Sequence, residues 1–256
     1  AYFYSIVQIY NGNNALVDFN NQYGLYPYFL LPIFKVFGLS VWSFTFLMAI
    51  LSMIAYLSVY CALRLLTKNI IYSVVGYFSI LYLTCIYRIM HIQEYYFQHW
   101  PHRFFPAAIS SLLIIFYFKS KPTKFKFIVV SIIFSAFIFW NLETGIVIYL
   151  SWLFIAIAED FKISLKWGYF CRIFYSIGTA MMCLAFVGGA LIMFIFLRSG
   201  KFPNFLDFLA YQKIFGGNGF LSLASNYRHP WILFIPVYGV IMYAAIASAK
   251  NHKEII

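Results

Sequence analysis

The chain has 256 residues, of which 64% are hydrophobic and 10% charged, and its mean hydropathy is +0.83. Soluble domains carry about 25% charged residues, so this composition excludes a soluble enzyme, and it also excludes a disordered chain, which requires low hydrophobicity. The net charge is +11 at pH 7. The basic residues lie mostly in short loops between apolar runs, so we expect membrane lipid as a partner. Because no basic stripe is interleaved with aromatic residues, we expect no nucleic acid.

Residues 1–40 are amphipathic and interrupted by polar residues, which is not typical of a membrane span. We expect a helix over 3–10 and a turn at Asn-Gly-Asn-Asn, 11–14. The chain begins with Ala1 and has no signal-peptide pattern. We therefore expect that at least one native helix precedes residue 1, or that the terminus is processed or engineered.

From residue 41 onward, apolar segments alternate with polar connections. Each segment should be a helix, because lipid offers no partner to unpaired backbone groups. The predicted fold is all-α: a polytopic membrane bundle of about seven transmembrane segments over 41–256, preceded by the juxtamembrane segment 1–40. The predicted segments are 41–64, 70–87, 104–118, 125–140, 145–158, 173–197 and 231–249. The third to fifth are short for a span of about 20 residues.

The charges of the connections predict the orientation. Eleven of the 18 basic residues lie in one set of connections, which the positive-inside rule assigns to the cytoplasm. They are Arg64, Lys68, Lys119, Lys121, Lys124, Lys126, Lys162, Lys166, Arg172, Lys250 and Lys253. The loops 1–40, 88–103 and 198–230 and the connection 141–144 then share the outer side of the membrane.

Most acids and histidines fall on this outer side, so a polar site is expected there. They are Asp18, Glu94, Glu143, Asp207, His91, His99, His102 and His229. The four cysteines, Cys61, Cys85, Cys171 and Cys183, are widely spaced and form no CxxC motif. They indicate neither a metal site nor a disulfide framework.

Asp18 is the only acid in the first 90 residues, and it follows the predicted turn. A carboxylate at a membrane surface can act as a general base toward an acceptor hydroxyl, or it can hold a divalent cation. The alternative is an ordinary solvated loop aspartate or a helix cap.

The segment RIMHIQEYYFQHWPHRFFP, 88–106, concentrates ionisable groups between two apolar segments. If it is helical, His91 and Glu94 share a face. Arg88 and Arg103 suit a phosphate, because a guanidinium can donate two hydrogen bonds at once. His91, Glu94 and His99 are also possible metal ligands, although no strong metal motif is present. The alternative is an interfacial loop whose aromatic residues form a membrane belt.

Glu143 lies in WNLETG, 140–145, between two apolar segments. An acid at that depth is costly unless it is paired, which favours a functional role. Its partner could be Arg88, Arg103 or a ligand hydroxyl. The alternative is a cap for a helix that begins at Gly145. In the loop 198–230, Arg228 lies beside the last apolar segment, where it could bind an anionic headgroup or serve as an ordinary interfacial anchor.

The stretch QYGLYPYFLLPIFKVFGLS, which follows Asp18, resembles the first outer loop of polytopic membrane glycosyltransferases of the GT-C superfamily. RFFPAAISSLL, WNLETGIVI and FLAYQKIFGGNGF, at 103–113, 140–148 and 208–220, are similar to later parts of such bacterial proteins. In that superfamily a first span precedes an outer loop that carries an essential acid. The resemblance implies that Asp18 is the catalytic acid, although the superfamily often has paired acids there. It also implies a polyprenyl-phosphate-linked sugar as donor, whose phosphate Arg103 or Arg228 would bind.

We therefore expect an integral-membrane glycosyltransferase that transfers a sugar from a polyprenyl-phosphate donor to an acceptor at the outer face of a bacterial inner (cytoplasmic) membrane. The expected substrate-binding residues are Arg103, Glu143, Glu94, His91, His102, Arg88, Arg228, Gln22 and Tyr23. The main alternative is a transporter or flippase of lipid-linked saccharides, but the apolar segments contain almost no ionisable residue at mid-depth to form its polar path. A polysaccharide polymerase or ligase and a non-catalytic scaffold are further alternatives.

Overall fold

The computed structural model describes residues 2–21, 24–82, 101–120, 123–163 and 168–206. The chain divides into two units, 1–208 and 209–256, and the second unit, with the predicted segment 231–249, lies outside the described residues. Within the described ranges every named element is a helix, and an isolated bridge joins Ala15 to Phe19. The all-α fold is thus confirmed for this part of the chain.

Two short helices precede the long ones. Helix α1 (Tyr2–Tyr10) matches the helix predicted over 3–10. Helix α2 (Tyr26–Phe37), which the sequence analysis did not predict, follows the loop. Its first turn contains Pro27, whose missing N–H would have no partner in a helix at that position, and the backbone leaves the helix at Gly38 with a φ of +77°.

The next two helices form a hairpin whose ends are capped by side chains. Ser40 and Ser43 form a reciprocal capping box at the start of α3 (Val41–Thr67), and the helix ends at Lys68 in a left-handed conformation. Asn69 then begins α4 (Ile70–Leu81) by accepting a hydrogen bond from the N–H of Ile71 at 2.8 Å. Such caps satisfy amide groups that have no partner within the helix.

Four further helices complete the described part: α6 (Pro101–Lys119), α7 (Lys124–Trp140), α8 (Leu142–Ile163) and α9 (Gly168–Ser199). Helices α6 and α8 each begin three residues before the predicted segments. Pro101 can start a helix because the first helical position needs no N–H partner, and Asn141 caps α8 by accepting from the N–H of Thr144 at 3.0 Å. These earlier starts bring Arg103 and Glu143 into first helical turns.

Three helical stretches are long and apolar enough to cross a membrane: Val41–Thr67, Pro101–Lys119 and Ile173–Ser199. Ile70–Leu81 and Leu142–Ile157 are apolar but shorter. The described residues therefore support a membrane protein with three candidate spans, and they do not confirm the predicted seven.

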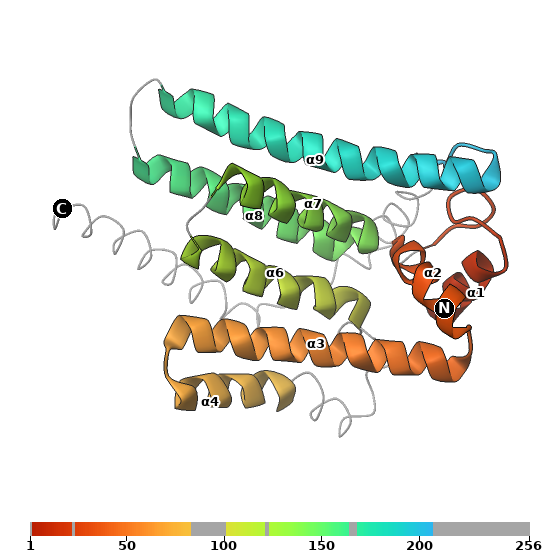
Figure 1. The fold of residues 1–256 in the computed structure, drawn as a ribbon, viewed down its shortest axis with the longest axis horizontal. Helices are drawn as coiled ribbons and strands as arrows, with labels where there is room; N and C mark the ends of the chain where they lie inside the picture. The colour runs from red at the N-terminus through yellow and green to blue at the C-terminus, as the bar shows by residue number, and fades with distance from the viewer. Residues whose placement is uncertain (1, 22–23, 83–100, 121–122, 164–167, 207–256) are drawn as a thin grey trace, which may run out of the picture. The chain divides into compact units, whose positions relative to one another are not determined.

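Helix α3 lies between α4 and α6, α7 packs against both α8 and α9, and α6 also packs against α7 and α8 (Figure 1). The core between α7 and α8 is aromatic. The indole of Trp152 is fully buried, stacks on Phe127 at 5.3 Å between ring centroids, and donates a hydrogen bond to Ser131 Oγ at 3.0 Å. Buried indoles of this kind need a partner for the N–H group, which explains a serine in the middle of an apolar helix.

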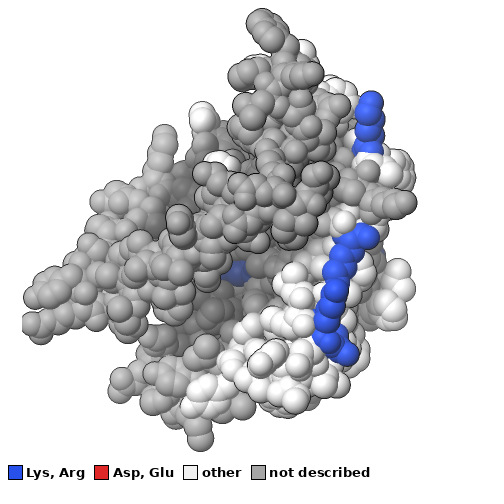
Figure 2. All heavy atoms as spheres, turned by 90° about the vertical axis from the view of Figure 1, so that its left-hand side faces the viewer, with Lys and Arg blue, Asp and Glu red and all other residues white. Residues whose placement is uncertain are grey.

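The two ends of the helices differ in charge. At one end, where α3 and α6 finish, five cations gather, and Lys119 donates to the carbonyl of Leu65. We call this the basic end; its members are Arg64, Lys68, Lys119, Lys124 and Lys126. Figure 2 views the chain from this side: Lys and Arg side chains are visible there, and no acidic side chain of the described residues is. Asp18 and Glu143 lie at the opposite end, beside α1 and α2.

This asymmetry leads to a test of the predicted orientation. A cysteine that replaces the exposed Ser120 at the basic end, in a variant without the native cysteines, should resist a membrane-impermeant reagent in intact cells and react after permeabilisation. A cysteine at the exposed Lys201, at the other end of α9, is the matched control and should react in intact cells. Labelling at position 120 in intact cells would reverse the orientation and the side of the membrane on which the candidate site lies.

Candidate functional site

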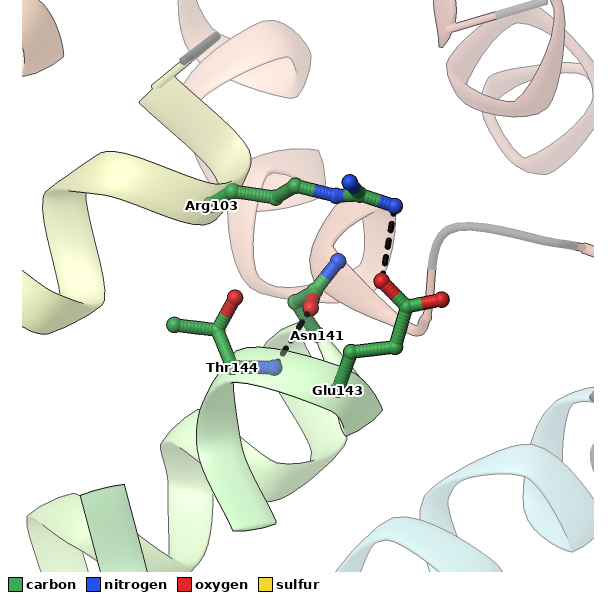
Figure 3. Close-up of polar contacts among 4 residues, drawn as sticks. All are labelled: Arg103, Asn141, Glu143 and Thr144. Carbon is green, nitrogen blue, oxygen red and sulfur yellow. Dashed lines mark hydrogen bonds and ion pairs between the residues drawn. The ribbon is translucent and has the colours of Figure 1, made fainter. Parts of the chain in front are cut away.

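An ion pair between Arg103 and Glu143 joins the first turns of α6 and α8. Arg103 Nη2 lies 2.7 Å from Glu143 Oε2, and Figure 3 shows the arginine extending across from α6, with Asn141 and Thr144 beside Glu143 at the start of α8. The carboxylate is well placed there, because the N-terminus of a helix carries partial positive charge. Arg103 was one of three partners considered for Glu143 from the sequence.

The ion pair consists of one contact, between Nη2 and Oε2, and is partly exposed to solvent. The side chains of Arg103 and Glu143 are 24% and 49% exposed, so the pair by itself adds little to stability, about 0–1 kcal/mol. Arg103 Nε, in contrast, is buried and has no hydrogen-bond acceptor among the described residues. A buried donor without an acceptor costs about 1–3 kcal/mol. The guanidinium contacts Glu143 through Nη2 and is partly exposed, so its outer nitrogens retain capacity for an anion beside Glu143.

A cluster of aromatic rings surrounds Trp140, at the end of α7 and close in sequence to Glu143. Trp140 Nε1 donates to the carbonyl of His102 at 2.9 Å, which ties the end of α7 to the start of α6. The rings of Tyr26, Phe29 and Phe105 lie 6.1, 5.8 and 5.7 Å from the Trp140 ring. This rigid contact holds Arg103, the next residue along α6, in place.

His102 and Tyr26 are interior residues in this arrangement. The His102 side chain is only 2% exposed, and its ring lies 6.0 Å from that of Tyr26. Neither ring is exposed to solvent in this packing. His102 therefore packs within the aromatic cluster and does not face a ligand. The Tyr26 side chain is buried as well.

The segment before α2 fastens to the end of α7 through backbone contacts. The Leu25 N–H donates to the carbonyl of Phe139 at 2.7 Å. Within the segment, the side-chain Nδ2 of Asn21 donates to the carbonyl of Gly24 at 2.6 Å. Ser5 Oγ in turn donates to Asn21 Oδ1 at 2.9 Å. Gly24 has a φ of +87°, and a Cβ there would lie 2.3 Å from the carbonyl oxygen of Trp140. Only glycine permits both this conformation and this approach.

Asp18 is exposed in the loop between α1 and α2, where it closes a local turn. Its Oδ2 accepts from the N–H of Asn14 at 2.7 Å, while its own N–H donates to the Asn14 carbonyl at 2.8 Å. Oδ1 accepts no hydrogen bond from the described residues. The carboxylate is therefore fixed in position by one oxygen and presents the other to water, which suits a positioned base as well as a structural clamp.

A second apolar cluster holds this loop against α9. Its buried members are Ile9, Ala15, Leu16, Leu25, Tyr28, Leu31 and Ile195. The N–H of Asn204 donates to the carbonyl of Leu16 at 2.8 Å, and Arg198 donates to the carbonyl of Ile9. Loop, α2 and the end of α9 are thereby joined.

Tyr28 adds a polar contact to this cluster. Its hydroxyl donates to the Ala15 carbonyl at 3.3 Å. Burial raises the pKa of Tyr28 to about 12, so the phenol stays protonated and the hydrogen bond to the loop persists throughout the neutral range.

The remaining predicted site residues lie outside the described residues: Gln22, Tyr23, Arg88, His91, Glu94 and Arg228. Among the described residues, no three His, Cys, Asp or Glu side chains gather as metal ligands would. The sequence analysis missed the role of Asn141, whose position two residues before Glu143 is a readable helix-cap signal. It missed Gly24 because close approach of two distant backbones leaves no local signal.

No protein-family model, curated protein or solved structure matches this chain at a significant level.

Proposed function

We propose that the chain is an integral-membrane glycosyltransferase that transfers a sugar from a polyprenyl-phosphate donor to an acceptor at the end of the helices that carries α1 and α2. The observation that carries the proposal is the partly exposed Arg103 guanidinium at the start of an apolar helix, which contacts Glu143 through Nη2. Such a group suits a phosphate that arrives on a lipid.

In the proposed reaction, the oxygen of the acceptor hydroxyl attacks the anomeric carbon and its proton passes to the Asp18 carboxylate. The bond between the anomeric carbon and the phosphate oxygen breaks, and the phosphate leaves with the electron pair. Arg103 neutralises the charge that develops on the leaving phosphate. Glu143 orients the guanidinium, or accepts from a sugar hydroxyl once the phosphate has engaged Arg103.

The decisive experiment uses the purified full-length protein with a radiolabelled polyprenyl-phosphate sugar in vesicles. Transfer of the label to an acceptor is the expected result. Movement of the labelled lipid between leaflets without transfer would instead establish the flippase alternative and refute the enzymatic proposal.

Replacing Arg103 by Lys should weaken binding of the lipid-linked sugar about tenfold or more, because an ammonium keeps the charge but loses the forked hydrogen bonds. Binding of the labelled donor to detergent-solubilised protein measures the effect. Arg64→Lys, at the exposed basic end, is the matched control and should bind normally. Wild-type affinity in both Arg103→Lys and Arg103→Ala would remove this residue from the donor site.

A further inference from the structure

Helix α2 leaves apolar side chains exposed near its C-terminal end. Most of its other apolar side chains are buried in the two apolar clusters. Ile33, Val36 and Phe37, in the last turns, are instead 37%, 77% and 78% exposed. A surface helix usually presents polar residues to water, so this end of α2 is suited to apolar surroundings.

The exposed apolar surface continues past the turn at Gly38 into α3. The turn at Gly38 and the capping box of Ser40 and Ser43 fix the direction in which α3 leaves. Val41 and Trp42 follow at 64% and 84% exposure. We call these exposed residues the corner patch: Ile33, Val36, Phe37, Val41 and Trp42. A contiguous apolar patch on a protein marks a partner or a membrane.

The dimensions of α3 favour lipid as that partner. Exposed apolar residues continue along the helix at Phe46, Met53 and Leu57, so the corner patch adjoins the surface of a candidate span. Arg64 lies 22 positions after Trp42, which corresponds to about 33 Å of helix, close to the hydrocarbon thickness of about 30 Å. Tryptophan is enriched at both boundaries of the hydrocarbon layer, and basic residues are in excess in the loops on the cytoplasmic side.

The charges around the patch agree with this placement. Lys35 is the only charged residue of α2. Its ammonium lies 4.7 Å from the centre of the Tyr10 ring and 3.5 Å from the Tyr10 carbonyl oxygen. The cation thus lies against α1, and none of the five residues of the patch carries a charge.

We propose that the corner patch inserts into the boundary between headgroups and acyl chains of one bilayer leaflet, with Trp42 as its anchor. Because the Tyr28 hydroxyl ties α2 to the loop at Ala15, this anchor also holds the Asp18 loop close to the membrane surface. The proposal concerns lipid contact and is independent of any glycosyl transfer.

Tryptophan fluorescence in vesicles tests the anchor. The difference between the emission of the wild-type protein and that of Trp42→Phe isolates the Trp42 signal. In phosphatidylcholine vesicles this signal should be quenched by lipids brominated near the top of the acyl chain, more weakly by lipids brominated near the methyl end, and hardly at all by aqueous iodide. Strong iodide quenching without lipid quenching would place Trp42 in water and refute the proposal. Quenching by neither reagent would indicate a protein partner, such as a second copy, and would refute it equally.

A second variant avoids dependence on a small difference signal. A nitroxide on Phe37→Cys, in a background without the native cysteines, should be more accessible to oxygen than to a water-soluble nickel complex. A nitroxide on Asn13→Cys, in the exposed loop of the same unit, should show the opposite preference. Equal preference at both positions would overturn the proposal.

Discussion

Asp18→Asn should lower the turnover of the proposed glycosyl transfer at least about 100-fold, the lower range for losing a positioned acid–base group. The substitution keeps the shape of the side chain and an oxygen that can still accept from the N–H of Asn14, which Asp18 Oδ2 meets at 2.7 Å. The loop should therefore remain folded while the ionised group is lost. Turnover with a labelled donor, and thermal stability in detergent, measure the two effects.

The competing acid is Glu94, which lies outside the described residues. Glu94→Gln serves as the comparison in the same full-length protein. If Asp18→Asn retains near-normal turnover while Glu94→Gln is inactive, the base belongs to the segment 88–103 and Asp18 serves only as the clamp of its turn. If Asp18→Asn loses both activity and thermal stability, its effect is structural, and the assignment to catalysis fails in that form.

Gly24→Ala should destabilise the protein by several kcal/mol. A Cβ at this position would lie 2.3 Å from the Trp140 carbonyl oxygen and 3.0 Å from the Asn141 Cα, both of which belong to the backbone. Overpacking typically costs about 1–3 kcal/mol, and the left-handed conformation adds about 1–2 kcal/mol for any residue with a side chain. Thermal unfolding in detergent measures the loss.

Gly12→Ala is the matched control for this prediction. Gly12 also has a positive φ, +106°, but no atom lies within 4 Å of the place its Cβ would occupy. It should therefore show the conformational cost alone. Equal losses of stability at the two positions would mean that the loop does not press against the end of α7, contrary to the structure. A larger loss at Gly24 should be accompanied by weaker donor binding, since Trp140 and Asn141 support the Arg103–Glu143 pair.

The location of the candidate site could be predicted in outline, but its pairing could not. Hydropathy and loop charge place Arg103 and Glu143 at the same end of the helices, because both lie next to apolar segments whose directions alternate. That these two residues pair depends on the packing of α6 near α8. The spacing of residues along the chain does not predict that packing.

By itself, the sequence determined what depends on local composition: the helical fold of the described segments, the helix over 3–10, the gathering of cations at the basic end and the choice of Arg103, Glu143 and Asp18 as candidates. Only the tertiary structure decided that His102 and Tyr26 lie inside, and that Gly24 touches Trp140. It alone showed that apolar side chains near the end of α2 stay exposed. Burial and close approach arise between residues far apart in the chain, and packing selects among side chains that hydropathy treats alike.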